Sequence, residues 1–370
     1  MITGEVELSP LTLDPTGTLR RDSPRPWYLR QPGYDDAFDW HTIYYDIFRA
    51  TDGAVVLLGP SLRTLTPIVQ SATQIAFDVP RSAVAIRTLN RNAQIWLPST
   101  LSTVVFNGLG VQTRIAVQPN CCAWFRGKRV IFVLSRNNDL QWIRDWAAFY
   151  VRKHGCNAVL FYDNASSRYA GGDIHRALSG IAGLDTVVVV AWPYKFGPSG
   201  GQEQQWDSDF CQYGALEHAR HRFLGFADAC LHADIDELVT THDRSSVFDR
   251  VLNNRTGYIC YGGEWVENVR AEPPDAQRRH AQFRYRLPRS PTPVRPKWAI
   301  VPACCPPKSQ WRVHDVAGMR SDRLASKGVL TQHFRAINTN WKFERWRPEE
   351  LTPSHILDAE LAWWLDGLND

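Results

Sequence analysis

The sequence predicts an α/β protein with a doubly wound sheet and, before it, a smaller β-rich domain. From residue 129 onward, short apolar strands alternate with amphipathic helices, which is the pattern of a sheet covered by crossover helices. Between residues 40 and 120, short β-like runs instead follow one another with turn residues between them. Regularly spaced short strands are typical of a small antiparallel sandwich.

The first third of the chain divides into an arm and an accessory domain. Residues 1–39 are rich in Pro, Gly, Asp and Arg and predict an irregular arm. Residues 40–120 predict a β-sandwich-like accessory domain without an evident chemical cluster, which suits support, oligomerisation or ligand binding. Its expected strands are 42–48, 54–58, 74–79, 83–89, 93–97, 103–106 and 113–117.

Residues 125–345 predict the main α/β domain, and residues 346–370 a helical tail. The expected strands of this region are 129–134, 158–162, 186–191 and 257–261, and three further apolar runs lie at 298–301, 311–316 and 329–334. The expected helices are 139–154, 173–183, 210–226, 245–253 and 355–368. A polar, Pro-rich stretch at about 262–296 has a length that is usually functional or disordered inside a domain.

Composition excludes several classes of protein. The 370 residues carry 42 Lys and Arg against 38 Asp and Glu, a net charge of +4. Without a basic block this charge does not indicate nucleic-acid binding. The eight cysteines include no Cys-x-x-Cys pair, so a zinc ribbon is not expected and the thiols read as small core residues.

The sequence also predicts a cytoplasmic location. The first residues lack the basic and apolar pattern of a signal peptide, and no apolar run reaches the roughly 18 residues that span a bilayer. Trp341, Trp346 and the pair Trp363 and Trp364 lie among Lys and Arg residues. They suggest peripheral contact with a membrane surface or an acceptor, although most of them suit core packing better. The β-rich domain makes self-association a reasonable expectation.

The most informative segment is the acidic stretch at residues 233–238. It follows the apolar run 229–231, so it reads as the end of a buried strand. Asp234 and Asp236 alternate along the chain and can share one divalent cation, with Glu237 in support. Carboxylate oxygens suit Mg²⁺ or Mn²⁺, and the open positions of such an ion usually go to phosphate oxygens.

A second carboxylate stands at the end of another predicted strand. Asp163 follows the run 158–162. In doubly wound sheets, ligands bind outside the carboxyl ends of the strands. Asp163 and Asp234 are therefore expected at the same edge of the sheet, although an Asx turn would also explain Asp163.

Three segments together resemble the GT-A-fold glycosyltransferases of the family-2-like and family-92-like group. Residues 133–139, with the helix start at 143–146, are similar to that group's first strand and turn, although Asn138 stands where Glu is usual. Residues 161–167 are similar to its Tyr-Asp-Asn-x-Ser segment, and residues 231–238 to its Asp-x-Asp-Glu-Phe pattern. The resemblance covers about residues 129–340.

The resemblance implies a Rossmann-like mixed sheet with helices on both faces, and a metal-dependent transfer of sugar from a nucleotide-diphosphate sugar, UDP-sugar foremost. The acceptor would be a hydroxyl of a glycan or another glycoconjugate, and the cofactor Mn²⁺ or Mg²⁺. The implied nucleotide-binding residues are Arg136, Asp163, Asp234 and Arg335. The implied metal ligands are Asp234, Asp236 and His314, with Lys297 and His333 in support of the metal or diphosphate.

Such a transfer needs charge stabilisation and a base. Cations offset the charge that grows on the leaving diphosphate. In an inverting transfer, which we expect, a carboxylate takes the proton of the acceptor hydroxyl. Glu264 is the first candidate because it follows a strand and flanks Trp265; Glu267 and Asp315 come next.

Two other functions remain open at the level of sequence. A phosphatase or phosphotransferase could use Asp234 as nucleophile and Asp236 as acid, but such enzymes usually place Asp-x-Asp on the first strand of the domain. A carbohydrate-binding protein without catalytic activity would explain the departure at Asn138.

Overall fold

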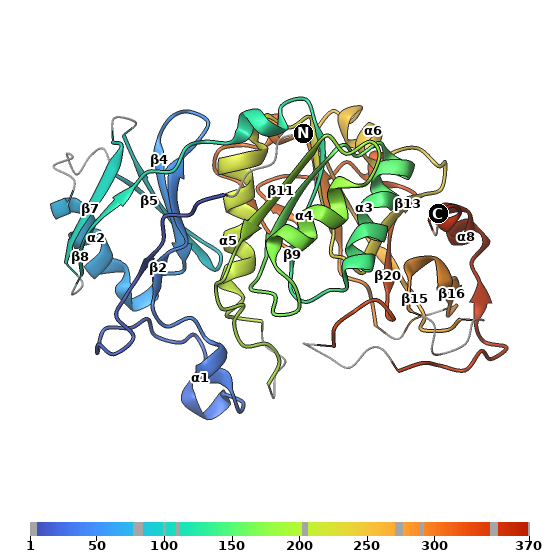
Figure 1. Ribbon diagram of the computed structural model, residues 1–370, viewed down its shortest axis with the longest axis horizontal. Helices are drawn as coiled ribbons and strands as arrows, with labels where there is room; N and C mark the ends of the chain where they lie inside the picture. The colour runs from blue at the N-terminus through green and yellow to red at the C-terminus, as the bar shows by residue number, and fades with distance from the viewer. Residues whose placement is uncertain are drawn as a thin grey trace. The chain divides into compact units, whose positions relative to one another are not determined.

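A computed structural model describes residues 6–76, 84–98, 101–108, 111–201, 206–270, 277–288, 290, 292–340 and 347–368. The chain forms two compact units (Figure 1). The first contains Trp124–Trp192 and the chain from Phe226 onward, and the second contains Val6–Ala123 and Pro193–Gly225. The segment Pro193–Gly225, which the sequence places in the main domain, thus clusters with the β-rich unit.

A six-stranded mixed sheet forms the centre of the first unit. Its order is β11-β10-β9-β12-β17-β14. The strands are β11 (Thr186–Ala191), β10 (Ala158–Asp163), β9 (Arg129–Ser135), β12 (Ala229–His232), β17 (Lys297–Ile300) and β14 (Tyr258–Tyr261). The first four are parallel, and β17 runs antiparallel to both of its neighbours. The mixed α/β class is therefore confirmed, and the strand order reverses between β9 and β12.

The two faces of this sheet are covered differently. Helices α3 (Leu140–His154), α4 (Gly171–Ser179) and α6 (Val247–Leu252) share one apolar core with alternate strand residues such as Ile131 and Val133. In Figure 1, α3 and α4 lie side by side over the strands. The intervening strand residues Phe132, His232 and Trp298 form an aromatic cluster with Trp311, which comes from outside this sheet. The sequence predicts helices on both faces of the sheet, but α3, α4 and α6 all pack on the same face.

Helix α3 begins and ends where its sequence predicts. The Asp139 side chain accepts a hydrogen bond from the Gln141 amide, which caps the first turn. Gly155 adopts φ 67° and closes the last turn, a left-handed conformation that favours glycine. The helix also reaches the second sheet, because the Tyr150 hydroxyl donates to the Glu237 carbonyl at 3.0 Å and accepts from the Val239 amide at 3.2 Å.

The second sheet of this unit has the order β13-β20-β15. Its strands are β13 (Glu237–Thr241), β20 (Val329–Phe334) and β15 (Gly263–Val266). β20 pairs antiparallel with β13 and parallel with β15. The remaining elements are β16 (Tyr285–Arg286) with β21 (Ile356–Leu357), β18 (Gln310–Trp311) with β19 (Val316–Ala317), α7 (Arg323–Ser326) and α8 (Ala359–Leu365). The predicted C-terminal helix is therefore shorter than 355–368, and the run 311–316 is a tight turn between two short strands.

The second unit is built on the antiparallel sheet β3-β4-β6-β5. These strands are β3 (Asp46–Arg49), β4 (Val55–Pro60), β6 (Asn92–Leu97) and β5 (Ala85–Leu89). Smaller pairs are β1 (Leu11–Thr12) with β2 (Thr42–Tyr44) and β7 (Thr103–Gly108) with β8 (Val111–Ala116). Its helices are α1 (Tyr34–Ala37), α2 (Thr66–Ala76) and α5 (Phe210–His218), and α5 continues as a π-helical turn, Ala219–Phe223.

Two strand predictions in this unit are wrong. Residues 74–76 belong to the end of α2, while 77–79 lie outside the described residues. The run 42–48 forms two strands, β2 and β3, separated at Tyr45. Short apolar runs do not distinguish a strand from a buried helix by periodicity alone.

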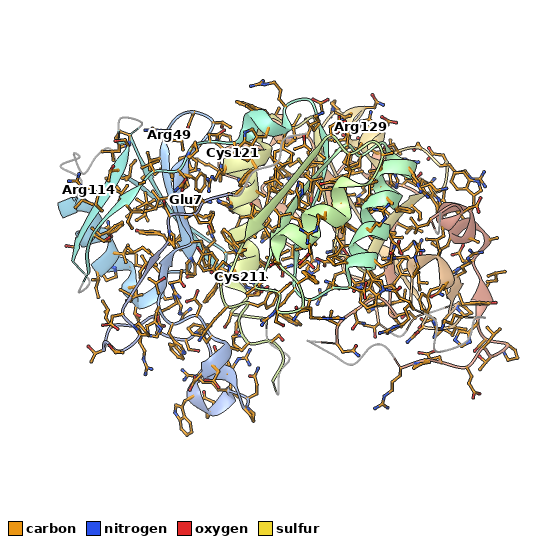
Figure 2. The ribbon with its side chains drawn as sticks, in the orientation of Figure 1. Glu7, Arg49, Arg114, Cys121, Arg129 and Cys211 are labelled. Atoms are coloured by element: carbon orange, nitrogen blue, oxygen red, sulfur yellow. The ribbon has the colours of Figure 1, made fainter. Side chains whose placement is uncertain are left out.

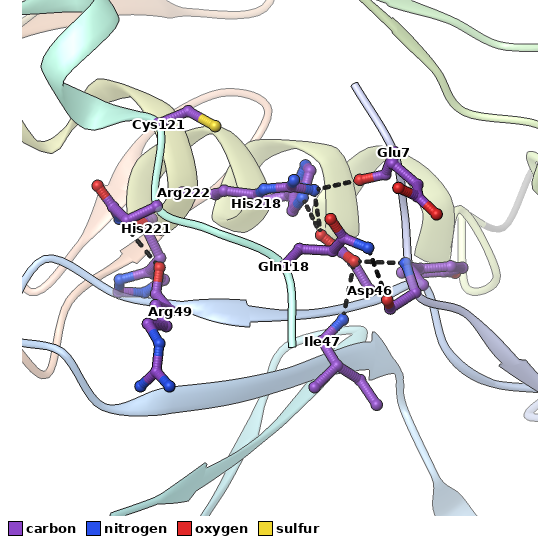
Figure 3. Close-up of polar contacts among 12 residues, drawn as sticks. Glu7, Asp46, Ile47, Arg49, Gln118, Cys121, His218, His221 and Arg222 are labelled. Carbon is purple, nitrogen blue, oxygen red and sulfur yellow. Dashed lines mark hydrogen bonds and ion pairs between the residues drawn. The ribbon is translucent and has the colours of Figure 1, made fainter. Parts of the chain in front are cut away.

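A buried polar cluster joins distant segments of the second unit (Figure 3). The Asp46 carboxylate is fully buried and accepts from the Ser9 and Ile47 amides. It also contacts His218 Nε2 at 2.8 Å and the Arg222 guanidinium at 2.6 Å. Burial alone would raise the pKa of Asp46, but His218 and Arg222 hold it below its ordinary value. A buried charge with this many partners is a structural anchor.

The expectation that the cysteines are core residues holds for five of the eight, because Cys304 is exposed and Cys260 and Cys305 are partly exposed. All eight cysteines are free thiols and five are buried, including Cys121 and Cys211 (Figure 2). Within the described ranges, no helix has the length and apolar character needed to cross a membrane. Trp341 and Trp346 lie outside the described residues, whereas Trp364 is buried in the core of the first unit.

We predict that Tyr150→Phe lowers the free energy of unfolding by about 1–3 kcal/mol, because it leaves the buried Val239 amide without its acceptor. Denaturant unfolding followed by tryptophan fluorescence measures the change. Tyr28→Phe is the matched control, since Tyr28 is 64% exposed. Equal stability of the two variants would contradict the role given to the Tyr150 hydroxyl.

Candidate functional site

A buried lysine stands at the centre of the acidic segment. Lys297 Nζ lies 2.7 Å from Asp234 Oδ2 and 2.8 Å from Glu237 Oε2. The side chains of Lys297 and Glu237 are each only 2% exposed. The pairing of β12 with β17 matches His232 to Trp298, so Lys297 stands opposite Ala233. Strand register therefore delivers the ammonium group to the acidic turn.

Charge, rather than burial, decides the protonation of this lysine. Burial alone would lower the pKa of Lys297, but Asp234 and Glu237 together raise it above its ordinary value. Burial raises the pKa of Glu237, and the neighbouring Asp234 and Asp236 oppose the lowering effect of Lys297. Lys297 is consequently a permanent cation at neutral pH.

Asp236 has a different partner. Its Oδ2 lies 3.0 Å from His333 Nε2, and both side chains are partly exposed. The Phe334 amide donates to the Asp236 carbonyl at 2.8 Å, which fixes the turn against β20. Glu237 Oε1 lies 3.8 Å from His333 Nδ1. The pair is therefore oriented from both sides and still reaches solvent.

A row of stacked side chains continues from His333 along one face of the second sheet. The Trp265 ring is stacked on His333 with centroids 4.2 Å apart. The Arg335 guanidinium lies over the same Trp265 ring, 4.3 Å from its centroid. Arg335 Nε is 2.8 Å from Glu267 Oε2, and Glu267 is 2% exposed. Burial raises the pKa of Glu267, which Arg335 partly offsets.

Asp163 ends the parallel strand β10, as the sequence predicts. Two loops are fastened together beside it: Asn137, at φ 57°, accepts from the Ser167 amide at 2.8 Å, and its own amide donates to Ser166 Oγ. Burial raises the pKa of Asp163, while Ser166 and Arg136 act in the opposite direction. β9 separates β10 from β12. Two strand spacings separate β10 from β12 laterally by about 10 Å. β10 ends level with Ser135 of β9 and β12 ends level with Phe132, so Asp234 lies two residues beyond the end of its strand.

Three other predicted residues are not part of this row, although His314 lies close enough to the acidic cluster for Lys297 and Asp234 to act on its pKa. Glu264 pairs in register with Gln332, one residue before the Trp265–His333 pair, so its side chain points to the opposite face of the sheet. Asp315 forms an ion pair with Arg312 at 2.5 Å. His314 Nδ1 lies 3.1 Å from the Pro296 carbonyl. Desolvation, followed by repulsion from Lys297, lowers the pKa of His314 to about 4.

Asp236 and His333 are the two side chains that could act as protein ligands to a divalent cation here. No group of three or more His, Cys, Asp or Glu side chains in the described ranges forms a complete metal site. Asp236 Oδ2 and His333 Nε2 are hydrogen-bonded at 3.0 Å. Adjacent octahedral ligands at about 2.1 Å from a metal are also about 3 Å apart. Asp234, expected as a metal ligand, instead contacts Lys297. The structure thus brings Asp236 together with His333 rather than with His314.

Sequence reasoning missed the positions of Lys297 within the acidic cluster and of Trp265 between two functional side chains. One signal was available for the lysine. Lys297 directly precedes the apolar run 298–301. A lysine at the start of a buried strand needs a carboxylate partner. No comparable local signal exists for Trp265, because its neighbours come from another strand.

Comparisons with known proteins add little. No protein-family model matches the chain, and no curated protein does. One similar solved structure is the apo form of WbbM, a bifunctional glycosyltransferase, with 11% identity and a TM-score of 0.27. The match covers 41% of this chain and 26% of that one. A likeness of this size carries no argument about fold or function.

Proposed function

We propose that this chain is a glycosyltransferase of GT-A fold that moves a sugar from a nucleotide-diphosphate sugar, UDP-sugar foremost, to a hydroxyl of a glycan or glycoconjugate. One observation supports this most: Asp163 ends β10 and Asp234 lies two residues beyond the end of β12, on strands about 10 Å apart on either side of β9, next to the point where strand order reverses. That spacing suits the two ends of a nucleoside diphosphate. The partly exposed Asp236–His333 pair stands beside the second carboxylate.

The nucleoside would bind at the β10 end of this edge. Asp163 would accept hydrogen bonds from the base or the ribose hydroxyls, and Arg136 lies close enough to lower its pKa. Asn137 and Ala165 both adopt positive φ in the adjacent loops. Such strained loop positions are found at ligand sites more often than elsewhere.

The diphosphate would bind at the β12 end. Asp236 and His333 would hold a divalent cation, Mn²⁺ or Mg²⁺, which when bound supplies positive charge to the phosphate oxygens. Arg335 lies on the same face of the sheet, stacked on Trp265 and paired with Glu267. Its fixed guanidinium would stabilise the charge that develops on the leaving diphosphate.

Glu267 is the carboxylate that best suits the role of base. It lies on the same face of the sheet as His333, whereas Glu264 points to the other face. Glu267 Oε1 is buried without a hydrogen-bond partner among the described residues. In the transfer, the acceptor oxygen bonds to the anomeric carbon, the bond to the diphosphate breaks with its electrons, and Glu267 takes the acceptor proton.

The phosphatase alternative is weaker in the light of the geometry. Its nucleophile would be Asp234, whose Oδ2 is held by the Lys297 ammonium at 2.7 Å. The ion pair makes the bound oxygen of Asp234 a weaker nucleophile. The Arg335 contact likewise weakens Glu267 Oε2 as a base, but Glu267 Oε1 has no hydrogen-bond partner among the described residues.

We predict that UDP with Mn²⁺ raises the thermal unfolding midpoint of the wild type by about 5 °C at saturating ligand, and that EDTA removes the shift. GDP, CDP and dTDP, each with Mn²⁺, Mg²⁺ or EDTA, complete the titration. Asp236→Asn should lose the metal-dependent part of the shift. Asp35→Asn is the control, because that side chain is 69% exposed and lies in the other unit.

A wild-type protein that shifts with none of the nucleotides would contradict the proposed donor site. A shift without turnover on any acceptor would favour the binding protein over the enzyme.

We also predict that Glu267→Gln lowers kcat by about 10²–10⁴-fold, the usual contribution of a general base. Glu264→Gln should keep the wild-type kcat. The rate of the wild type should fall as pH decreases through the Glu267 pKa, which burial places above the ordinary 4.5. Steady-state transfer measured against pH tests both statements, and the opposite ranking of the two variants would assign the base to Glu264.

A further inference from the structure

We propose that Lys297 sets the affinity of the neighbouring Asp236–His333 pair for a divalent cation by neutralising part of the acidic cluster. The inference rests on the proposed function, because it concerns the cation of that site. It gives Lys297 a role other than contact with the diphosphate.

The position of Lys297 excludes direct contact with a ligand. Its ammonium group already contacts two carboxylates, those of Asp234 and Glu237. Glu237 also accepts from the Asp234 amide at 2.9 Å, so one carboxylate fastens both the lysine and the turn. A diphosphate oxygen would have to displace one of these carboxylates to reach Nζ.

The position also excludes use of Lys297 as an amine nucleophile. Such a lysine must lose its proton near neutral pH, which requires a lowered pKa. Here the two carboxylates raise the pKa of Lys297 above its ordinary value. What the side chain supplies is a fixed positive charge.

That charge matters because three carboxylates meet within four consecutive residues. Asp234, Asp236 and Glu237 are acids of one turn, and Asp236 is the one that faces His333. With all three ionised, Lys297 leaves two net negative charges, which a divalent cation balances. Without the lysine, three negative charges would lie within a few ångströms of the cation.

The consequence is a graded cation affinity. Each unit of charge next to a divalent ion changes its binding energy by an amount that corresponds to about tenfold or more in affinity, even at a high effective dielectric constant. Lys297 therefore keeps the bare site weak, so that cation binding depends on the phosphate oxygens of the nucleotide. Lys297 is in this sense a positioning residue for charge and does not touch the substrate.

The test is a charge series measured with Mn²⁺ alone. Free Mn²⁺ is quantified by its electron paramagnetic resonance signal while the full-length protein is titrated in the absence of nucleotide. The variants are Glu237→Gln, Lys297→Met and the double variant Lys297→Met with Glu237→Gln. With Asp234, Asp236 and Glu237 ionised, their net charges are one, three and two negative units, against two in the wild type.

We predict that Glu237→Gln binds Mn²⁺ about tenfold more weakly than the wild type and that Lys297→Met binds it about tenfold more tightly. The double variant should return to within about threefold of the wild type, since its net charge is the same. If Lys297→Met does not fold, because it leaves buried carboxylates unpaired, the double variant and Glu237→Gln still decide. Restoration of affinity by the second substitution supports the inference.

Affinities that do not change across the series, or a double variant that binds as weakly as Glu237→Gln, would overturn the role of Lys297 and leave the proposed function intact. A wild type that binds no Mn²⁺ with or without UDP would overturn the metal site itself, and with it this inference. The two failures are therefore distinguishable.

Discussion

The first unit depends on one interaction, the contact of the buried Lys297 ammonium with Asp234 and Glu237. A buried charge without partners costs several kcal/mol, so the burial of Lys297 depends on its contacts with the two carboxylates. Lys297 begins β17 of the six-stranded sheet, and Glu237 begins β13 of the smaller one. The ion cluster therefore fixes how the two sheets of this unit meet, and it does so at the edge where the strand order reverses.

The remaining side chains of the site are oriented by strand pairing that starts at this junction. Once Glu237 is fixed, antiparallel pairing places His333 opposite it, and parallel pairing places Trp265 beside His333. Arg335 and Glu267 follow on the same face by the alternation of strand residues. Each side chain of the row is held in place by its neighbour. The positive charge of Arg335 is therefore already oriented before a ligand binds. Preorganised charges of this kind contribute most to catalysis because they need not reorganise during the reaction.

Sequence reasoning recovered what local pattern determines. The alternation of strands and helices from residue 129 and the carboxylates at two strand ends follow from periodicity and position, and the structure contains both. It placed Glu264 before Glu267 as the candidate base, because local sequence does not show which of two residues three apart, on and just after a strand, faces the site. Only pairing with β20 shows which of them faces His333. The sequence predicts a helix at 210–226. It does not predict the unit to which that helix belongs, because α5 contacts β4 and β6, which are far away in the sequence.

The central claim is that a nucleotide and a divalent cation bind at the edge where the Lys297 cluster meets His333. A crystal structure of the protein with UDP and Mn²⁺, with anomalous diffraction collected to locate manganese, tests it most directly. The account predicts one manganese peak between Asp236 and His333, with the diphosphate beside it, the nucleoside at Asp163, and Lys297 still paired with Asp234 and Glu237. A manganese peak elsewhere, or a diphosphate bound directly to a displaced Lys297, would contradict it.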